Sequence, residues 1–252
     1  MNDEQLLRYS RQIMLPEVDM EGQQALADAH VLVVGMGGLG SPAAMYLAAG
    51  GVGHLTLADD DVVELSNLQR QILHSGEDIG RPKVESAADT LRALNPEVGI
   101  TTLQRRLDQD ALIEQVLKVD LVLDGTDNFA TRFAVNAACV AAGRPLVSGA
   151  AIRLEGQIAV FRPDLPDHPC YACLFPPSDD QRLSCSENGV LAPVVGVIGS
   201  LQAVEAMRLI TGFGQDTGTW LTLWDARTGD WQRVRVPKDP ECPVCGQHAA
   251  SS

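Results

Sequence analysis

The feature that most constrains the fold is a glycine-rich segment directly after a short apolar run. The expected strand at 30–35 contains Val-Leu-Val-Val and is followed by a Gly-x-Gly-x-x-Gly pattern at Gly35, Gly37 and Gly40, with Gly38 inside it. A β-rich apolar run of this length is typical of a buried parallel strand. The glycine pattern is typical of the turn into a helix whose N-terminus binds a phosphate.

Strands and helices alternate on both sides of this turn. The next segments predict a helix at 42–49 and a strand at 54–58, which together with the first strand have the size of a βαβ unit. Further helices are expected at 83–94, 110–118 and 128–142, and further strands at 99–103, 120–124 and 145–148. The sequence therefore predicts an α/β fold with a doubly wound, Rossmann-like, mostly parallel sheet.

The two ends of the chain have a different pattern. Residues 1–29 predict a helical arm, with helices at 3–14 and 21–28. After residue 150 we expect a strand at 156–161, a long loop over 162–190, a helix at 192–210 and an antiparallel pair of strands at 220–224 and 231–236. We expect a single domain over 1–252, composed of the arm (1–29), a nucleotide-binding core (30–150) and a C-terminal region (151–252).

The chain is acidic: Lys and Arg total 19, Asp and Glu total 33, and the formal net charge is −14 at pH 7. This balance argues against a protein that coats nucleic acid. No apolar run of about 18 residues is evident, and the polar N-terminus does not resemble a signal peptide. We therefore expect a cytoplasmic protein that binds neither nucleic acid nor membrane.

Three charged residues accompany the glycine turn. Asp59 ends the second expected strand about 20 residues after Gly40, where an acid can accept a hydrogen bond from a ribose hydroxyl. Arg70 and Lys83 have the side chains that hold polyphosphate. Taken one at a time, Arg70 and Lys83 are as well explained as surface charges on a solvated loop. The glycine turn alone fits NAD, FAD, S-adenosylmethionine or ATP. The turn, the acid and the two cations together favour a polyphosphate ligand.

A second polar segment, Asp124-Gly-Thr-Asp127-Asn128, follows the expected strand at 120–124. Ligands of open α/β sheets bind beyond the carboxyl ends of the strands, and Mg²⁺ binds through one or two carboxylates plus substrate phosphates. Asp127 or Asn128 could instead cap the following helix. The two roles can also be divided between the two residues.

Two Cys-x-x-Cys pairs, Cys170 with Cys173 and Cys242 with Cys245, supply the four thiolates of a structural zinc site. We expect a zinc clasp that joins the long loop to the C-terminal tail. A redox pair is the alternative, but two such pairs without a thioredoxin-like context favour zinc.

The other two cysteines have separate expectations. Cys139 lies in the expected helix at 128–142 and is predicted to be a buried small side chain. Cys185 lies in the polar loop and is either a nucleophile or acyl acceptor, or an ordinary loop cysteine.

In combination and in this order, these motifs resemble the MoeB/ThiF family, the prokaryotic relatives of ubiquitin-activating enzymes. The resemblance covers nearly the whole chain and rests on Arg8-Tyr-Ser-Arg-Gln-Ile13, the glycine turn, Ser66-Asn-Leu-Gln-Arg-Gln71, Arg81-Pro-Lys83, Asp124 to Asn128 and the paired cysteines. It implies an adenylyltransferase that uses ATP to activate the C-terminal Gly-Gly of a ubiquitin-like sulfur-carrier protein. A separate protein would donate the sulfur.

The resemblance favours a MoaD-like carrier for molybdenum cofactor biosynthesis, with adenylylation of a ThiS-like carrier for thiamine thiazole as the alternative. Cys185 matches a cysteine that can join the carrier covalently in the thiamine branch, but the molybdopterin branch has one too. From another class, the alternative is a Rossmann-fold NAD or FAD oxidoreductase. Hydride transfer gives Arg70, Lys83 and Asp127 no obvious role.

The resemblance also implies the roles of individual residues. Arg11, Arg70, Lys83 and Asp127 would be catalytic, Asp127 would hold Mg²⁺, and Arg11 would reach the site of the other subunit of a homodimer. The C-terminal region would bind the carrier. The residues expected to contact ATP are Gly35, Gly37, Gly38, Gly40, Asp59, Ser66, Asn67, Leu68, Gln69, Arg70, Lys83, Asp127 and Asn128.

Overall fold

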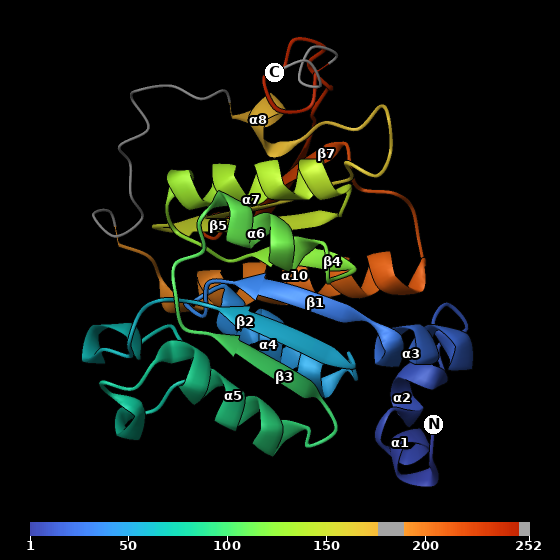
Figure 1. Ribbon diagram of the computed structural model, residues 1–252, viewed down its shortest axis with the longest axis vertical. Helices are drawn as coiled ribbons and strands as arrows, with labels where there is room; N and C mark the ends of the chain where they lie inside the picture. Colours follow the sequence, from blue (N-terminus) through green and yellow to red (C-terminus); the bar gives the residue numbers. More distant parts are fainter. Residues whose placement is uncertain (176–188, 247–252) are drawn as a thin grey trace.

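The structure is a computed structural model that describes residues 1–175 and 189–246. Within these residues, one eight-stranded sheet carries helices on both faces (Figure 1). Its order is β3-β2-β1-β4-β5-β6-β7-β8, parallel from β3 to β5 and antiparallel from β5 to β8. The α/β fold with a mostly parallel sheet and antiparallel C-terminal strands is therefore confirmed. The strands are β1 (His30–Val34), β2 (His54–Ala58), β3 (Gly99–Leu103), β4 (Leu121–Asp124), β5 (Leu146–Ile152), β6 (Glu155–Phe161), β7 (Trp220–Asp225) and β8 (Asp230–Arg235).

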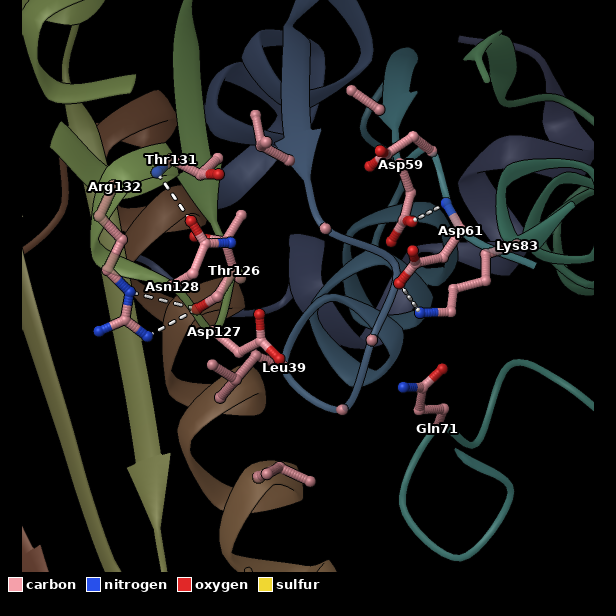
Figure 2. A pocket seen from close by; sticks show the side chains of 18 of the residues that line it. Leu39, Asp59, Asp61, Gln71, Lys83, Thr126, Asp127, Asn128, Thr131 and Arg132 are labelled. Atoms are coloured by element: carbon pink, nitrogen blue, oxygen red, sulfur yellow. Dashed lines mark hydrogen bonds and ion pairs between the residues drawn. The ribbon is translucent and has the colours of Figure 1, made fainter. Parts of the chain in front are cut away.

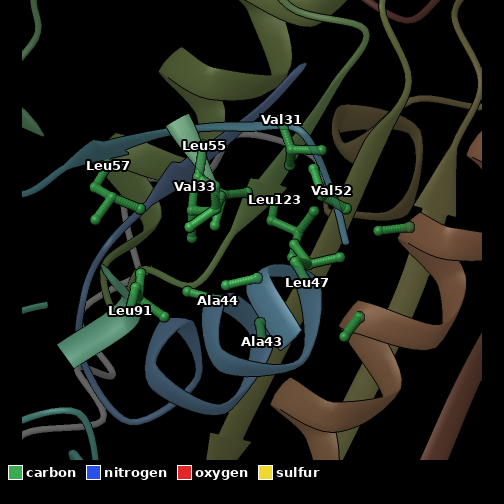
Figure 3. Close-up of a cluster of buried hydrophobic side chains, with 14 of the residues drawn as sticks. Val31, Val33, Ala43, Ala44, Leu47, Val52, Leu55, Leu57, Leu91 and Leu123 are labelled. Carbon is green, nitrogen blue, oxygen red and sulfur yellow. The ribbon is translucent and has the colours of Figure 1, made fainter. Parts of the chain in front are cut away.

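The period-2 geometry of the strands divides the buried residues between two cores. In β1, Val31 and Val33 face one core, whereas Leu32 and Val34 face the other. The first core lies under α4 (Gly40–Ala49), α5 (Lys83–Leu94) and α10 (Ala192–Thr211), and Figure 3 shows side chains of β1, β2 and β4 packed there against α4. The second lies under α6 (Gln109–Val116) and α7 (Phe129–Ala142). Burial on both faces explains why the central strands are continuous apolar runs.

The order of the strands reverses between β1 and β4. From β1 the chain passes through α4 to β2 on one side, while β4 pairs with the other side of β1. The turns after these two strands touch, because a Cβ atom on Gly35 would lie 3.0 Å from the carbonyl carbon of Gly125. Open α/β sheets bind their ligands at such a topological switch point.

The N-terminal arm contains three helices: α1 (Asp3–Arg8), α2 (Ser10–Ile13) and α3 (Asp19–Asp28). The helix predicted at 3–14 is interrupted at Tyr9, whose ring is buried and whose hydroxyl accepts a hydrogen bond from Asn95 Nδ2 at 2.9 Å. The last of these helices leads directly into β1. The arm therefore lies at the amino ends of the parallel strands (Figure 1).

Short helices interrupt segments predicted as loops. Two 3₁₀ helices, η1 (Leu65–Asn67) and η2 (Gly76–Asp78), lie between β2 and α5. A further helix, α8 (Tyr171–Leu174), lies in the segment predicted as a long loop, next to the C-terminal segment (Figure 1). Single-turn helices carry no hydrophobic periodicity, so the sequence pattern gives no sign of them.

The segment 192–211 is not an uninterrupted apolar run, because Gln202, Glu205 and Arg208 lie within it. Helix α10 is long and apolar enough, by length and composition, to cross a membrane. In this fold it packs on α4, β5 and β6. Ala203 and Ala206 are buried in the first core, and Ile198 is buried in a smaller cluster with Leu39 and Val194. Its apolar composition therefore has a structural explanation within the fold.

Candidate nucleotide and metal sites

A cavity of about 700 Å³ lies at the switch point, beyond the carboxyl ends of β1, β2 and β4. Many of the residues predicted from the sequence meet in its wall. Figure 2 shows Asp59, Asp61 and Lys83 on one side of it, and Asp127, Asn128 and Arg132 on the other. The predicted residues in the wall are Gly35, Gly37, Gly38, Asp59, Gln69, Arg70, Lys83, Asp127 and Asn128.

The glycines of the turn have two different functions in the fold. Gly35 has φ +92°, and a Cβ atom on Gly40 would lie 1.9 Å from the carbonyl oxygen of Gly35, so these two are required for backbone conformation and close packing. A Cβ atom on Gly37 would meet only the Gln71 side chain, at 3.5 Å. A Cβ atom on Gly38 would lie 2.9 Å from Val195 Cγ2, so close packing also favours a glycine there. Gly37 and Gly38 line the cavity at the N-terminus of α4, where an anion is favoured.

Acidic and basic groups are held together at the end of β2. Asp59 accepts hydrogen bonds from the N–H of Met36 at 2.7 Å and of Asp61 at 2.9 Å. Burial raises the pKa of Asp59, while nearby Lys83 and these hydrogen bonds oppose that rise. Lys83 is buried and donates to Asp61 Oδ2 at 2.8 Å, although the Asp61 side chain is 67% exposed. A buried ammonium facing the cavity is thus held by a carboxylate at its mouth.

The structure separates the roles of the polar residues after β4. Asn128 caps α7 by accepting a hydrogen bond from the N–H of Thr131 at 2.9 Å. Asp124 is fully buried and accepts hydrogen bonds from Thr126 and Ser148. Asp127 is exposed to the cavity and has no hydrogen bond or ion pair to another described residue, which leaves its carboxylate free for a ligand.

Arg70 lines the cavity and donates to the carbonyl of Ser66 at 3.1 Å. Four other residues expected to contact ATP are absent from the cavity wall: Gly40, Ser66, Asn67 and Leu68. Gly40 packs behind the turn, and the other three form η1 and its C-terminal cap. Their predicted contacts with ATP stay predictions.

Arg11 lies far from this cavity. Its neighbour Gln12 donates to the carbonyl of Gly50, the residue that follows α4, at 2.9 Å. The cavity is at the other end of α4, and a helix of ten residues is about 15 Å long. Arg11 is exposed, at the opposite end of the sheet from the cavity of its own chain.

Several residues of the wall are not among those predicted from the sequence. Gln71 is 4% exposed, and its Oε1 has no hydrogen-bond partner among the described residues. An unpartnered buried amide at the edge of a cavity can be satisfied by a ligand. Arg105, Arg106 and Arg132 add positive charge to the wall. The double arginine was a visible sequence signal, whereas the position of Gln71 depends on tertiary structure.

The four predicted zinc ligands meet beside α7. Their sulfur atoms all lie within 4.8 Å of one another, with 3.7 Å between Cys170 and Cys242 and 3.4 Å between Cys173 and Cys245. Tetrahedral zinc with bonds of about 2.3 Å places its sulfur ligands about 3.8 Å apart. All four are free thiols. The donor set and its spacing fit a structural zinc ion.

Backbone and side-chain groups support this cluster. Asn136 Nδ2 donates to Cys170 Sγ at 3.6 Å, and the N–H of Asp239 donates to Cys173 Sγ at 3.5 Å. Hydrogen bonding from the Cys170 thiol lowers the pKa of Cys173. Such donors stabilise the thiolates that bind a metal.

Of the two remaining cysteines, Cys139 and Cys185, the structure describes only the first. Cys139 is 1% exposed in the core under α7, and burial raises the pKa of its thiol, as expected of a buried small side chain. Cys185 lies outside the described residues.

Comparison with known proteins decides the family. Residues 9–244 match the ThiF family. The chain belongs to the ThiF family. This ThiF-family chain is 50% identical to the molybdopterin-synthase adenylyltransferase of Escherichia coli (strain K12), over 98% of this chain and 99% of that protein.

A second relative of this ThiF-family chain is named for a different carrier protein. The sulfur carrier protein ThiS adenylyltransferase of the same strain is 48% identical, over 98% of this chain and 97% of that protein. A crystal structure of E. coli MccB with ATP has a TM-score of 0.84, covering 95% of this chain and 73% of that chain at 24% identity. The structural match shows a shared fold, and the two sequence matches are nearly equal.

Proposed function

We propose that this chain adenylylates the C-terminal glycine of a ubiquitin-like sulfur-carrier protein with ATP. The observation that carries the proposal is the composition of the cavity at the switch point. A glycine turn, a buried lysine and an unpaired aspartate face one another across it. Relatives named as adenylyltransferases of sulfur-carrier systems, similar over nearly their whole length, support the same reaction.

In this reaction a carboxylate oxygen of the carrier attacks the α-phosphorus of ATP. The new bond is an acyl–phosphate bond, and the bond to the bridging oxygen of pyrophosphate breaks, so that acyl-AMP and pyrophosphate are formed. The attacking group and the leaving group are both anionic. The protein therefore has to bring two anions together and stabilise the charge of the pentavalent transition state.

The residues of the cavity suit these tasks. Gly37 and Gly38 present backbone N–H groups, and Asp59 lies where a ribose hydroxyl can donate to it. Lys83 and Arg70 supply cations for the phosphates. Asp127 would hold Mg²⁺, which would add positive charge against the phosphates.

A second hollow of about 700 Å³ offers a path for the carrier tail. It lies over β5 to β8 and shares Asp127, Arg132 and Ala151 with the nucleotide cavity. Phe129, Leu223 and Trp224 make part of its wall apolar. An extended Gly-Gly terminus lying in it would bring its carboxylate next to Asp127. This placement supports the assignment of carrier binding to residues 151–252.

We assign a MoaD-like carrier, and hence molybdenum cofactor biosynthesis, as the main function and a ThiS-like carrier as the alternative. The similarity to both adenylyltransferases supports the shared reaction more than either carrier. A separate protein would donate the sulfur. Free thiols at all five described cysteines are consistent with the reducing cytoplasm, where we place the enzyme.

Pyrophosphate exchange tests the reaction. Labelled pyrophosphate should enter ATP only when Mg²⁺ and a carrier ending in Gly-Gly are both present, because the reverse reaction needs acyl-AMP. We expect the rate with a MoaD-like carrier to exceed that with a ThiS-like carrier by about tenfold, a difference of about 1.4 kcal/mol in transition-state free energy. A carrier without its last glycine is the control. Absence of exchange, with oxidation of NADH instead, would refute the proposal.

The cysteine cluster gives a prediction on stability. Cys242→Ser should lose the roughly one zinc ion per chain that we expect in the wild type, and the melting temperature should fall by about 2–4 °C for each kcal/mol of stability lost. The reason is that the metal would join α8 to the C-terminal segment, next to the apolar contacts of Ala172 and Val244. Cys139→Ala, at a buried cysteine outside the cluster, should keep its zinc. Freshly purified wild-type protein without zinc would contradict the assignment.

A further inference from the structure

The peptide groups on both sides of Met36, inside the glycine turn, are fixed by side chains from other segments. The N–H of Met36 donates to Asp59 Oδ2 at 2.7 Å. Its carbonyl oxygen lies 3.0 Å from His74 Nε2. Met36 itself is fully buried. The part of the turn that leads into Gly37 is therefore held from both sides.

The hydrogen bonds of His74 define its tautomer. A carbonyl oxygen can only accept, so Nε2 of His74 carries a proton and donates to Met36. The other ring nitrogen, Nδ1, lies 2.8 Å from Ser86 Oγ on α5. Burial lowers the pKa of His74, which favours the neutral ring with its proton on Nε2.

The segment that carries His74 is itself anchored to α5. Thr90 Oγ1 donates to the carbonyl of Leu73 at 2.8 Å, and Ser86 holds the imidazole. The N–H of His74 donates to the carbonyl of Gln71 at 3.1 Å, which closes a turn between them. His74 therefore connects a rigid helix to the glycine turn, which is 38 residues earlier in the chain.

The hydrogen bond from His74 to the Met36 carbonyl also affects the N–H of Gly37, because both groups belong to one peptide unit. The carbonyl of Met36 and the N–H of Gly37 belong to one planar trans peptide group, in which they point in opposite directions. Because His74 binds the carbonyl from the buried side, the N–H of Gly37 points away from His74. Gly37 lines the cavity, and its N–H has no backbone partner among the described residues.

We propose that His74 is a positioning residue of the nucleotide site: through the carbonyl of Met36 it orients the N–H of Gly37 toward a phosphate of the bound nucleotide. The inference rests on the proposed function for the identity of the nucleotide. His74 does not touch the nucleotide itself. Its contribution is a donor that keeps one peptide group from rotating when the cavity fills.

Two substitutions at this position separate the hydrogen bond from the volume of the side chain. Glutamine places Nε2 the same number of bonds from Cα as histidine does, so His74→Gln can still donate to Met36, whereas His74→Leu fills space without a donor. We expect His74→Leu to raise the dissociation constant of Mg·ATP, measured by calorimetry without carrier, by about tenfold or more, and His74→Gln by less than about threefold. The ATP KM in pyrophosphate exchange should follow the same order.

The control is His54→Leu. His54 lies at the amino end of β2, away from the cavity, and its Nε2 contacts Thr101 Oγ1 at 2.9 Å. This variant should bind ATP as the wild type does, and zinc content and melting temperature check that each variant is folded. If His74→Leu does not fold, His74→Gln and Ser86→Ala decide, with the serine variant expected to weaken ATP binding by about threefold or more.

The outcomes distinguish the two proposals. Normal ATP binding by a folded His74→Leu, or an equal loss in the glutamine and leucine variants, would overturn the role of His74. Wild-type protein that binds ATP but shows no exchange with any carrier would overturn the proposed reaction and leave His74 to be judged by binding alone. Wild-type protein that does not bind ATP would overturn both.

Discussion

Replacing Lys83 with methionine is expected to lower kcat/KM for ATP in carrier-dependent pyrophosphate exchange by about 10²- to 10³-fold, mostly through kcat. Methionine preserves the buried aliphatic volume and removes only the charge. The ammonium group is buried and faces the cavity, so water does not screen it as it would a surface lysine. Its attraction is largest when negative charge develops on the phosphates.

The acids around Lys83 enlarge the effect. Asp59, Asp60 and Asp61 have carboxylate oxygens within 4.8 Å of one another, and Lys83 is ion-paired with Asp61. Removal of the lysine would leave this cluster facing a polyphosphate. Asp61→Asn alone should have a much smaller effect, and in the Lys83→Met background it should recover part of the lost rate.

A matched control is available on the surface. Lys118 Nζ lies 2.6 Å from Oε1 of Glu114, four residues earlier in the chain, and both side chains are more than half exposed. Lys118→Met should leave exchange unchanged, since exposed pairs of this kind contribute little. Equal rates for Lys83→Met and the wild type would remove Lys83 from the proposed machinery.

The fold could be predicted from the sequence where burial leaves a pattern. The strand expected at 54–58 is found as β2, because a strand buried between its neighbours is an apolar run bounded by turns. The strand expected at 99–103 is found as β3, which lies at the edge of the sheet and is only partly buried. The strand expected at 145–148 is longer in the structure and ends at Ile152. Its second half, from Gly149, has no such pattern and is a strand because it pairs with β6.

The sequence also predicts part of the candidate site. The glycine turn, Asp59 and Asp127 each follow an expected parallel strand, and in the structure they line one cavity. The contacts that hold them, such as Lys83 with Asp61 and His74 with Met36, join segments whose approach depends on the packing of α5. The choice between Asp127 and Asn128 as the helix cap stayed open in sequence, and the side-chain geometry of Asn128 assigned it the cap.

The position of Arg11 leads to the second prediction. Arg11 lies at the amino ends of the strands, and the cavity lies at their carboxyl ends, so a catalytic role for Arg11 requires a second copy of the chain. In a homodimer with two-fold symmetry, each arm would serve the cavity of the other subunit. The arm has exposed apolar side chains suited to such an interface, among them Leu7, Met14 and Leu15.

Mixing two inactive variants tests this arrangement. Arg11→Ala and Asp127→Asn, each purified separately, should be slower than the wild type by about 10²-fold or more, because each would lack a charged group at both sites of the dimer. After subunit exchange in an equimolar mixture, about a quarter of the sites would combine an intact Asp127 with an intact Arg11 from the other subunit. Exchange activity should then recover to about a quarter of the wild-type rate.

Recovery of activity shows whether Arg11 acts on the cavity of its partner or on that of its own chain, because mixing cannot restore a site built from one chain. If Arg11 acted on its own chain, every site in the mixture would still lack Arg11 or Asp127. A mixture of Arg70→Ala with Asp127→Asn is the control, since both residues line the same cavity of one chain and should not complement each other. Recovery in that control, or none with Arg11→Ala after confirmed subunit exchange, would contradict the proposed homodimer.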